Sequence, residues 1–351
     1  MNRIPAGLIR ILPLVVLAGM LLPATAFGQA VGCSPTRGGV FFADVTGGGR
    51  ADAIVVNRDG ITVRRSNGRR FEPNELWTSG PFFGAVDGNV YVYFADVDGD
   101  GRADAIAVNE TGITVRRSDG HSFRANEDWT REGYMGTDQR GHPNIYFADV
   151  TGEHRASAIV VNPDGIVVRR SNGRRFTGNE KWTEGPYYGE RGTYFADVDG
   201  DGKADAIVVN RDGITVRRSD GTRFMPNELW LEEGAYRRNG GARFFFADVD
   251  GDGRADAILV SGSGVTVYLS DGSQFGPPMR WTRNAYLGEM GIFFADVTGY
   301  GNADAIVVNR NGVTVRPSNG SRFVGNEPWT EGAYYGDFGP TCSGGRYENR
   351  R

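Results

Sequence analysis

A single motif recurs six times along the chain and restricts what the chain can fold into. The copies read FFADVTGGGRADAIVVN or a close variant, and each carries a phenylalanine at the same position. These phenylalanines are Phe42, Phe94, Phe147, Phe195, Phe246 and Phe294. Their spacing of about 50 residues is typical of a propeller blade and too long for most helical repeats. The chain is therefore predicted to form an array of six similar units.

Each repeat reads as four short strands. In the fourth repeat, apolar runs at 194–198 and 204–209 flank an aspartate-rich loop, and residues 214–218 alternate between apolar and polar after a hairpin-type turn. A fourth strand is expected from about Phe224 to Trp230. The sequence has 53 glycines and no long helical pattern, which agrees with short strands and tight turns. We predict an all-β fold, a six-bladed β-propeller of four-stranded antiparallel blades.

The repeats define the expected boundaries. One propeller is predicted over 33–342, with repeats near 38–89, 90–142, 143–190, 191–241, 242–289 and 290–337, followed by a polar tail at 343–351. The topology places the aspartate loops on one face of the ring, and the connections between blades on the opposite face. The last repeat supplies its own outer strand, so we expect no strand exchange to close the ring.

The N-terminal residues have the features of an export signal. Two arginines precede an apolar run from Ile11 to Leu22, and small residues follow it. The run is too short to span a membrane. We expect residues 1–30 to be a signal peptide, cleaved after Ala26 or Ala30. The predicted location is secreted or extracytoplasmic, without membrane insertion after cleavage.

The two cysteines flank the repeats. Cys33 precedes the first repeat and Cys342 follows the last. In an exported protein this arrangement suggests a disulfide that joins the ends of a circular fold. A lipoprotein acylated on Cys33 is the alternative, but Ala30-Val31-Gly32 matches a lipobox poorly, and Cys342 would stay unpaired.

Aspartates dominate the loop between the first two strands. The fullest copies read Asp-x-Asp-Gly-Asp-Gly-x-Ala-Asp. Carboxylates at positions one, three, five and nine, with a backbone carbonyl at position seven, suit the oxygen shell of Ca²⁺. Zn²⁺ is disfavoured because no His or Cys recurs beside the loops. The loops predict about three strong, structural Ca²⁺ sites: Asp96, Asp98, Asp100, Arg102 and Asp104 in repeat two; Asp197, Asp199, Asp201, Lys203 and Asp205 in repeat four; and Asp248, Asp250, Asp252, Arg254 and Asp256 in repeat five.

The other three loops are incomplete. Weaker sites are expected where the first and last aspartates remain, at Asp44 with Asp52 and at Asp296 with Asp304. Repeat three has Ser157 at the last position and His154 in place of a glycine, and we expect it to be empty. For repeat three we favour the alternative to a calcium site, in which the remaining aspartate only caps backbone N–H groups.

The aspartate loop and the apolar strand after it resemble FG-GAP/VCBS repeats, the calcium-binding propeller repeats of integrin α-subunit heads and of many exported bacterial proteins and lectins. The resemblance covers about residues 38–337. It implies a propeller fold and calcium binding. The functions of such proteins are diverse, so the resemblance specifies the fold better than the function.

One tryptophan and an aromatic segment close each repeat. Aromatic faces beside polar groups suit sugars, and the candidate ligand-binding residues are Trp182, Tyr187, Tyr188, Tyr236, Tyr286, Tyr334 and Tyr335. The alternative is that the tryptophans fill space between outer strands, which we favour for them, and that the tyrosines brace the blade junctions. Four repeats also carry Arg-Arg pairs, in which one arginine is expected to meet Glu75, Glu127, Glu180 or Glu228.

The leading functional hypothesis is an exported, non-enzymatic binding module that recognises a glycan or a cell-surface protein through the face opposite the aspartate loops. The formal net charge is −4 and no basic stripe is present, which argues against nucleic acid. The alternatives are a polysaccharide lyase or hydrolase and a structural envelope spacer. The three histidines occupy unrelated repeat positions, so they indicate no shared catalytic site.

Overall fold

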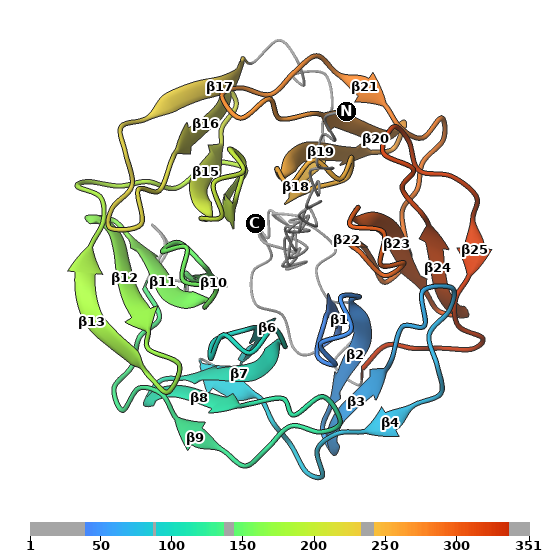
Figure 1. The fold of residues 1–351 in the computed structure, drawn as a ribbon, viewed down its shortest axis with the longest axis horizontal. Helices are drawn as coiled ribbons and strands as arrows, with labels where there is room; N and C mark the ends of the chain where they lie inside the picture. Colours follow the sequence, from blue (N-terminus) through green and yellow to red (C-terminus); the bar gives the residue numbers. More distant parts are fainter. Residues whose placement is uncertain (1–38, 87–88, 137–143, 233–241, 337–351) are drawn as a thin grey trace, which may run out of the picture.

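The computed structural model of the protein describes residues 39–86, 89–136, 144–232 and 242–336. Six antiparallel sheets are arranged radially around a central axis (Figure 1). The first long strand of each sheet lies nearest the axis and the last strand lies at the rim. The prediction of a six-bladed propeller with four-stranded blades is confirmed.

The first three blades contain the following strands. Blade one comprises β1 (Val40–Ala43), β2 (Asp52–Asn57), β3 (Gly60–Arg64) and β4 (Glu75–Leu76). Blade two comprises β6 (Asn89–Ala95), β7 (Asp104–Asn109), β8 (Gly112–Arg116) and β9 (Glu127–Asp128), to which β5 (Gly84–Val86) adds a fifth strand through a hairpin with β6. Blade three comprises β10 (Ile145–Ala148), β11 (Ser157–Asn162), β12 (Gly165–Ser171) and β13 (Phe176–Lys181).

The other three blades follow the same order. Blade four comprises β14 (Gly192–Ala196), β15 (Asp205–Val209), β16 (Gly213–Arg217) and β17 (Glu228–Glu232). Blade five comprises β18 (Arg243–Ala247), β19 (Asp256–Ser261), β20 (Gly264–Tyr268) and β21 (Met279–Arg280). Blade six comprises β22 (Gly291–Ala295), β23 (Asp304–Asn309), β24 (Gly312–Arg316) and β25 (Glu327–Pro328).

The rim strand of blade four begins later than expected from the sequence, whereas β13 of blade three covers the equivalent stretch from Phe176 to Lys181. In blade four the last strand begins at Glu228 and not near Phe224, which forms only an isolated bridge with Ser219. Pro226 lies between them and has no N–H group to donate to a neighbouring strand. The stretch from Phe224 to Glu228 therefore does not pair continuously with the third strand of the blade.

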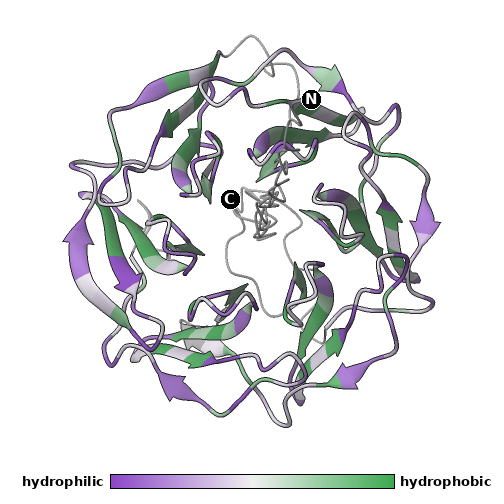
Figure 2. Ribbon diagram, in the orientation of Figure 1, coloured by the Kyte–Doolittle hydropathy of each residue, from purple (hydrophilic) through white to green (hydrophobic). Residues whose placement is uncertain are grey.

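The second strand of every blade is buried on both faces. In β15, for example, all five residues are buried. The hydropathy map shows the same division, with apolar residues in the inner strands and hydrophilic residues concentrated at the rim and in the loops (Figure 2). Burial of these inner strands between neighbouring blades supplies the main hydrophobic stabilisation.

Aromatic pairs join each blade to the next around the axis. Their ring centroids are 4.9 to 5.2 Å apart. The pairs are Phe41–Phe94, Tyr93–Phe147, Tyr146–Phe195, Tyr194–Phe246, Phe245–Phe294 and Phe293–Phe42. The last pair joins blade six to blade one, so the same contact that links neighbours also closes the ring.

A circle of backbone hydrogen bonds runs through the aspartate loops. The alanine N–H at position eight of each loop donates to the carbonyl of the first aspartate in the preceding blade, at 2.7 Å in all six blades. Ala51 donates in this way to Asp296 across the junction of blades one and six. The sheets of blades six and one each use consecutive strands of their own repeat, so the expected absence of a strand exchange that closes the ring is confirmed for the described residues.

Three predictions fall outside the described residues: the signal peptide at 1–30, the Cys33–Cys342 disulfide and the tail at 343–351. They stay predictions. Within the described residues no helix has the length and apolar character needed to cross a membrane.

Candidate functional site

The first aspartate of the loop holds the turn together in every blade. In blade two, one carboxylate oxygen of Asp96 accepts the Gly99 N–H at 2.7 Å and the other accepts the Gly101 N–H at 2.8 Å. Both glycines have φ near +84°, a conformation that L-residues with side chains rarely adopt. Asp44 and Asp296 make the equivalent bonds in the incomplete loops. This aspartate therefore has a capping role in all blades and does not by itself indicate a metal.

Repeat three keeps this turn without one of its glycines. His154 stands at that position and has φ +57°, the only positive φ among the described residues other than glycine. Its N–H still donates to Asp149 at 2.7 Å. The loop thus retains its backbone path while it lacks the carboxylates of positions three and nine, where Thr151 and Ser157 stand; Glu153 at position five pairs with Arg155.

The last aspartate of the loop is buried beneath it. In blade four, Asp205 accepts the N–H groups of Ser219 at 2.8 Å and Val198 at 3.1 Å. Burial, followed by the repulsion from Asp199, raises the pKa of Asp205 to about 8. Burial also raises the pKa of Asp256 to about 8 and that of Asp104 well above its usual range. A buried carboxylate of this kind is stabilised in its charged form by a nearby cation.

Position three distinguishes the complete loops from the others. Asp98, Asp199 and Asp250 each bring a third carboxylate close to the first and last ones. Ligand oxygens of the three lie within 4.8 Å of one another in three clusters: Asp96, Asp98 and Asp104; Asp197, Asp199 and Asp205; and Asp248, Asp250 and Asp256. These three clusters could hold metal ions.

Threonine takes this position in the other three loops and offers a hydroxyl donor in place of the charge. Thr298 Oγ1 donates to Asp304 at 3.0 Å, and Thr151 Oγ1 donates to Asp149 at 3.0 Å. In blade one, Thr46 Oγ1 donates to Asp44 at 3.2 Å. In these loops a hydroxyl donor replaces the negative charge of the position-three aspartate. No cation is therefore needed to offset a third carboxylate. The weaker pairs Asp44–Asp52 and Asp296–Asp304 belong to this type.

The structure does not bring the position-five aspartates into the clusters. Asp100 pairs with Arg102, Asp252 pairs with Arg254, and Asp201 lies 2.5 Å from Lys203 Nζ. Each therefore neutralises the side chain of the residue predicted to offer its carbonyl to the ion. The backbone carbonyls of Arg102, Lys203 and Arg254 stay predicted ligands.

The arginine pairs have two separate structural roles. The second arginine of each pair meets the predicted glutamate, at 2.9 to 3.0 Å in Arg65–Glu75, Arg117–Glu127, Arg170–Glu180 and Arg218–Glu228. That prediction is confirmed. The first arginine stacks over an aromatic ring of the preceding blade, as Arg217 does 4.6 Å above Tyr187. This cation–π contact was not predicted from the sequence, although the arginine and the aromatic residue recur with the same period.

Four of the seven candidate ligand-binding aromatics are buried. Trp182 packs against Phe224 at the blade edge. Tyr187, Tyr286 and Tyr334 are buried at blade junctions, where their hydroxyls donate to backbone carbonyls of the next blade. The structure thus gives these four residues bracing contacts. Tyr188 and Tyr335 are only half-buried and keep surface accessible to a ligand, whereas Tyr236 lies outside the described residues.

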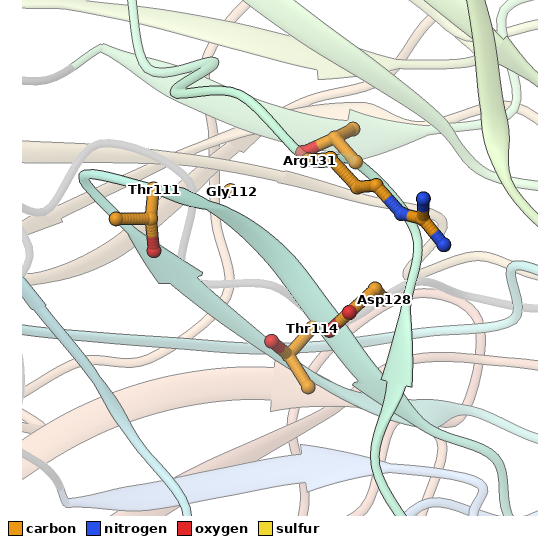
Figure 3. Close-up of a pocket in the computed structure, with 6 residues that line it drawn as sticks. Thr111, Gly112, Thr114, Asp128 and Arg131 are labelled. Atoms are coloured by element: carbon orange, nitrogen blue, oxygen red, sulfur yellow. The ribbon is translucent and has the colours of Figure 1, made fainter.

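A polar cavity of about 240 Å³ opens on blade two (Figure 3). Thr111 in the turn between β7 and β8 and Gly112 at the start of β8 line one end, and Thr114, Asp128, Thr130 and Arg131 complete the lining. The turn between β7 and β8 lies at the end of the blade opposite the aspartate loop. Asp128 pairs with Thr114 across the sheet, where blades one and four have Leu76 and Leu229. The acidic group is therefore a local feature of this blade that the repeat pattern did not indicate.

Comparison with protein families matches the FG-GAP-like repeat at residues 44–107, 197–259 and 248–307. Each matched segment begins at the first aspartate of a loop. Together with the six radial sheets, these matches make the chain an FG-GAP-repeat β-propeller. A comparison with curated proteins finds no match.

Two solved structures have related folds. One is a lectin of Agrocybe aegerita that recognises non-reducing terminal N-acetylglucosamine; it is 25% identical with a TM-score of 0.62, over 84% of this chain and 81% of the lectin. The other is the Tc holotoxin pore of Photorhabdus luminescens, 17% identical with a TM-score of 0.56 over 84% of this chain. The match spans only 14% of that toxin chain and shows the fold alone.

Proposed function

We propose that this protein is an exported glycan-binding propeller whose scaffold is stabilised by calcium. The observation that carries the proposal is the likeness to the N-acetylglucosamine-recognising lectin over most of both chains. The likeness covers 84% of this chain and is therefore not confined to one repeat. The proposal of export comes from the N-terminal sequence, with its short apolar run and small residues.

The proposed glycan surface is the face opposite the aspartate loops. Tyr188 lies on the connection from blade three to blade four, and Tyr335 lies at the equivalent position after the last strand of blade six; both expose part of their rings, which a sugar could cover with its C–H face. The blade-two cavity adds a carboxylate, a guanidinium and three threonine side chains. These groups can accept from and donate to sugar hydroxyls. Several weak subsites on one rigid ring would increase the affinity for a branched or repeated glycan.

Substitutions on this face should weaken glycan binding and leave the fold intact. We expect Tyr188→Ala, Tyr335→Ala and Asp128→Leu to lower binding to N-acetylglucosamine-terminated glycans, each by about fivefold to tenfold for a lost stacking or hydrogen-bonding contact. Leucine is the residue at the position of Asp128 in blades one and four, so the fold already tolerates it there. Glycan-array and calorimetric binding measurements would test this expectation.

The control is Leu229→Ala, which changes an exposed rim residue of blade four. Tyr187→Ala is unsuitable because Tyr187 is buried and its loss would destabilise the blade junction. An array that stays blank for the unaltered protein would contradict the proposed function.

The calcium proposal rests on the three carboxylate clusters. Asp96, Asp98 and Asp104 would hold one ion, and the equivalent residues of blades four and five would hold two more. Oxygen ligands alone, with no histidine or cysteine in the clusters, suit Ca²⁺. A bound ion would offset the repulsion among three carboxylates and fix the loop against the strand below it.

Changing one residue in blade five should remove one of three calcium sites. Asp250→Thr gives this loop the residue found in blades one, three and six, and we expect the calcium stoichiometry to fall from three to two. Asp252→Gly reproduces the residue of blade one at position five and should leave three sites, because Asp252 pairs with Arg254 outside the cluster. Calorimetric titration of metal-free protein measures both. An unchanged stoichiometry in Asp250→Thr would contradict the assignment.

A further inference from the structure

Blades two and four share a polar bridge from the aspartate loop to the rim tryptophan. In blade two, Arg117 lies 3.3 Å from Asp98 and 2.9 Å from Glu127, and Glu127 accepts the Trp129 indole N–H at 3.3 Å. In blade four, Arg218 lies 3.8 Å from Asp199 and 2.9 Å from Glu228, which accepts the Trp230 N–H at 3.1 Å. We call this Asp–Arg–Glu–Trp series the polar bridge.

Blade five keeps the two ends of the polar bridge and lacks its middle. Asp250 and Trp281 are present, but Leu269 stands in the place of the arginine and Met279 in the place of the glutamate. The register confirms the equivalence, because Met279 pairs with Val267 as Glu127 pairs with Val115. No guanidinium from the third strand can therefore reach Asp250.

The loss of the glutamate leaves Trp281 without a hydrogen-bond acceptor. The indole N–H groups of Trp77, Trp129, Trp182, Trp230 and Trp329 all donate to the glutamate two residues earlier. Trp281 is only 3% exposed and its Nε1 has no partner. A buried donor without an acceptor is uncommon in folded proteins and is destabilising. Met279, which replaces the glutamate, is 39% exposed and has a flexible side chain.

We infer that blade five carries a second sugar site, in which a pyranose lies against Leu269 and Met279, the residues that replace the arginine and the glutamate, and one of its oxygens accepts the Trp281 N–H when the exposed Met279 side chain turns aside. The half-buried Leu269 and the flexible thioether of Met279 provide an apolar surface for the C–H face of the ring. Asp250, at the other end, accepts from a sugar hydroxyl. A hydroxyl can both donate and accept, so one ring meets a donor at one end and a carboxylate at the other.

This inference takes its class of ligand from the proposed glycan binding but concerns a different surface. The polar bridge begins at the aspartate loops, whereas Tyr188, Tyr335 and the blade-two cavity lie toward the opposite face. The site also belongs to blade five alone among the described blades, since each of the others has the glutamate acceptor. One such site per ring is expected.

The test is to restore the polar bridge and to follow the Trp281 indole. Met279→Glu, alone or with Leu269→Arg, gives blade five the residues of blade four. The N–H then gains an acceptor, so these variants should fold with unchanged or higher Tm. In ¹H–¹⁵N spectra, methyl pyranosides and N-acetylglucosamine should shift the Trp281 indole signal of the unaltered protein, which Trp281→Phe identifies by its loss. In Met279→Glu we expect the apparent affinity at this signal to fall at least about tenfold.

The matched control is Leu76→Glu, which places a new carboxylate on the rim of blade one, where Trp77 already has an acceptor. It should leave the Trp281 response unchanged. Sugar binding that moves other signals but not that of Trp281, or binding at Trp281 that Met279→Glu does not weaken, overturns the inference alone. Absence of sugar binding anywhere in the protein overturns the inference and contradicts the proposed function as well.

Discussion

Removal of calcium at pH 8 is expected to lower the Tm by on the order of 10 °C or more and to leave the β-sheet structure intact at low temperature. Each site at about 100 times its Kd contributes roughly 2.7 kcal/mol, and about 1 kcal/mol shifts the Tm of a domain this large by roughly 2 to 4 °C. Three clusters can contribute in this way. Calorimetry with Ca²⁺ or with EGTA, accompanied by circular dichroism at 20 to 25 °C, roughly ambient temperature, measures both parts of the prediction.

The size of this effect should depend on pH. Burial raises the pKa of Asp205 and Asp256 to about 8, and burial raises the pKa of Asp52 and Asp304 to about 7, whereas an unfolded aspartate has a pKa of about 3.9. Between these values the metal-free folded state binds more protons than the unfolded state. The contribution of these aspartates to the stability of the metal-free folded state is therefore fully present below about pH 4, and it is lost as the pH rises through 7 to 8.

Protons and calcium compete for the same carboxylates, so EGTA should have its largest effect at pH 8 and a much smaller one near pH 5. The triple variant Asp98→Thr, Asp199→Thr and Asp250→Thr is the control, because every loop then has the residue of the incomplete type. EGTA should no longer change its Tm. An equal Tm with calcium and with EGTA in the unaltered protein at pH 8 would show that the clusters bind no stabilising ion.

The repeat made the fold predictable from the sequence because it contains all that one blade needs. Two apolar runs, an alternating run and the turns between them lie within each 50-residue unit, so local pattern and blade coincide. The β5 strand was not predicted because residues 84–86 belong to a variable connection between repeats. Its pairing depends on the position of β6 and not on a periodic signal.

The aspartate loops were predictable only in part. The sequence indicated that blades two, four and five differ from the rest, and the clusters form in these three blades. It did not indicate that Asp100, Asp201 and Asp252 would pair with the next cationic side chain. The side chains of positions five and seven lie next to each other in the folded loop. The carboxylate at position five therefore pairs with the cationic side chain at position seven.

The contacts between blades were the least predictable. The partner of Tyr187 is a backbone carbonyl and an arginine in the next repeat, and no sequence neighbour reveals that geometry. The unsatisfied N–H of Trp281 is likewise visible only when the tryptophans are compared in space. Methionine and glutamate have side chains of similar length, so the presence of methionine in the rim strand of blade five does not draw attention in the sequence. It nevertheless leaves Trp281 without the glutamate acceptor that the other five indoles use.

Loss of the Tyr334 side chain is the second change for which a large effect is expected, because it opens the junction between the first and last blades. Its hydroxyl donates to Ala53 O at 2.8 Å, and Arg64 lies 4.5 Å above its ring. Tyr334→Ala removes a buried aromatic side chain and should lower the free energy of unfolding by about 3 to 5 kcal/mol. Tyr334→Phe retains the ring and should cost about 1 kcal/mol. Denaturant unfolding measures both values.

Tyr187→Ala is the matched variant at the junction between blades three and four, where the hydroxyl donates to Ala206 O and Thr215 O and Arg217 lies over the ring. The two junctions use the same contacts, so the two alanine variants should lose similar stability. A small effect of Tyr334→Ala beside a large effect of Tyr187→Ala would contradict closure by these contacts. If a reducing agent then destabilised the protein strongly, the predicted Cys33–Cys342 disulfide would account for closure, because a covalent link between the chain ends limits how far blades six and one can separate.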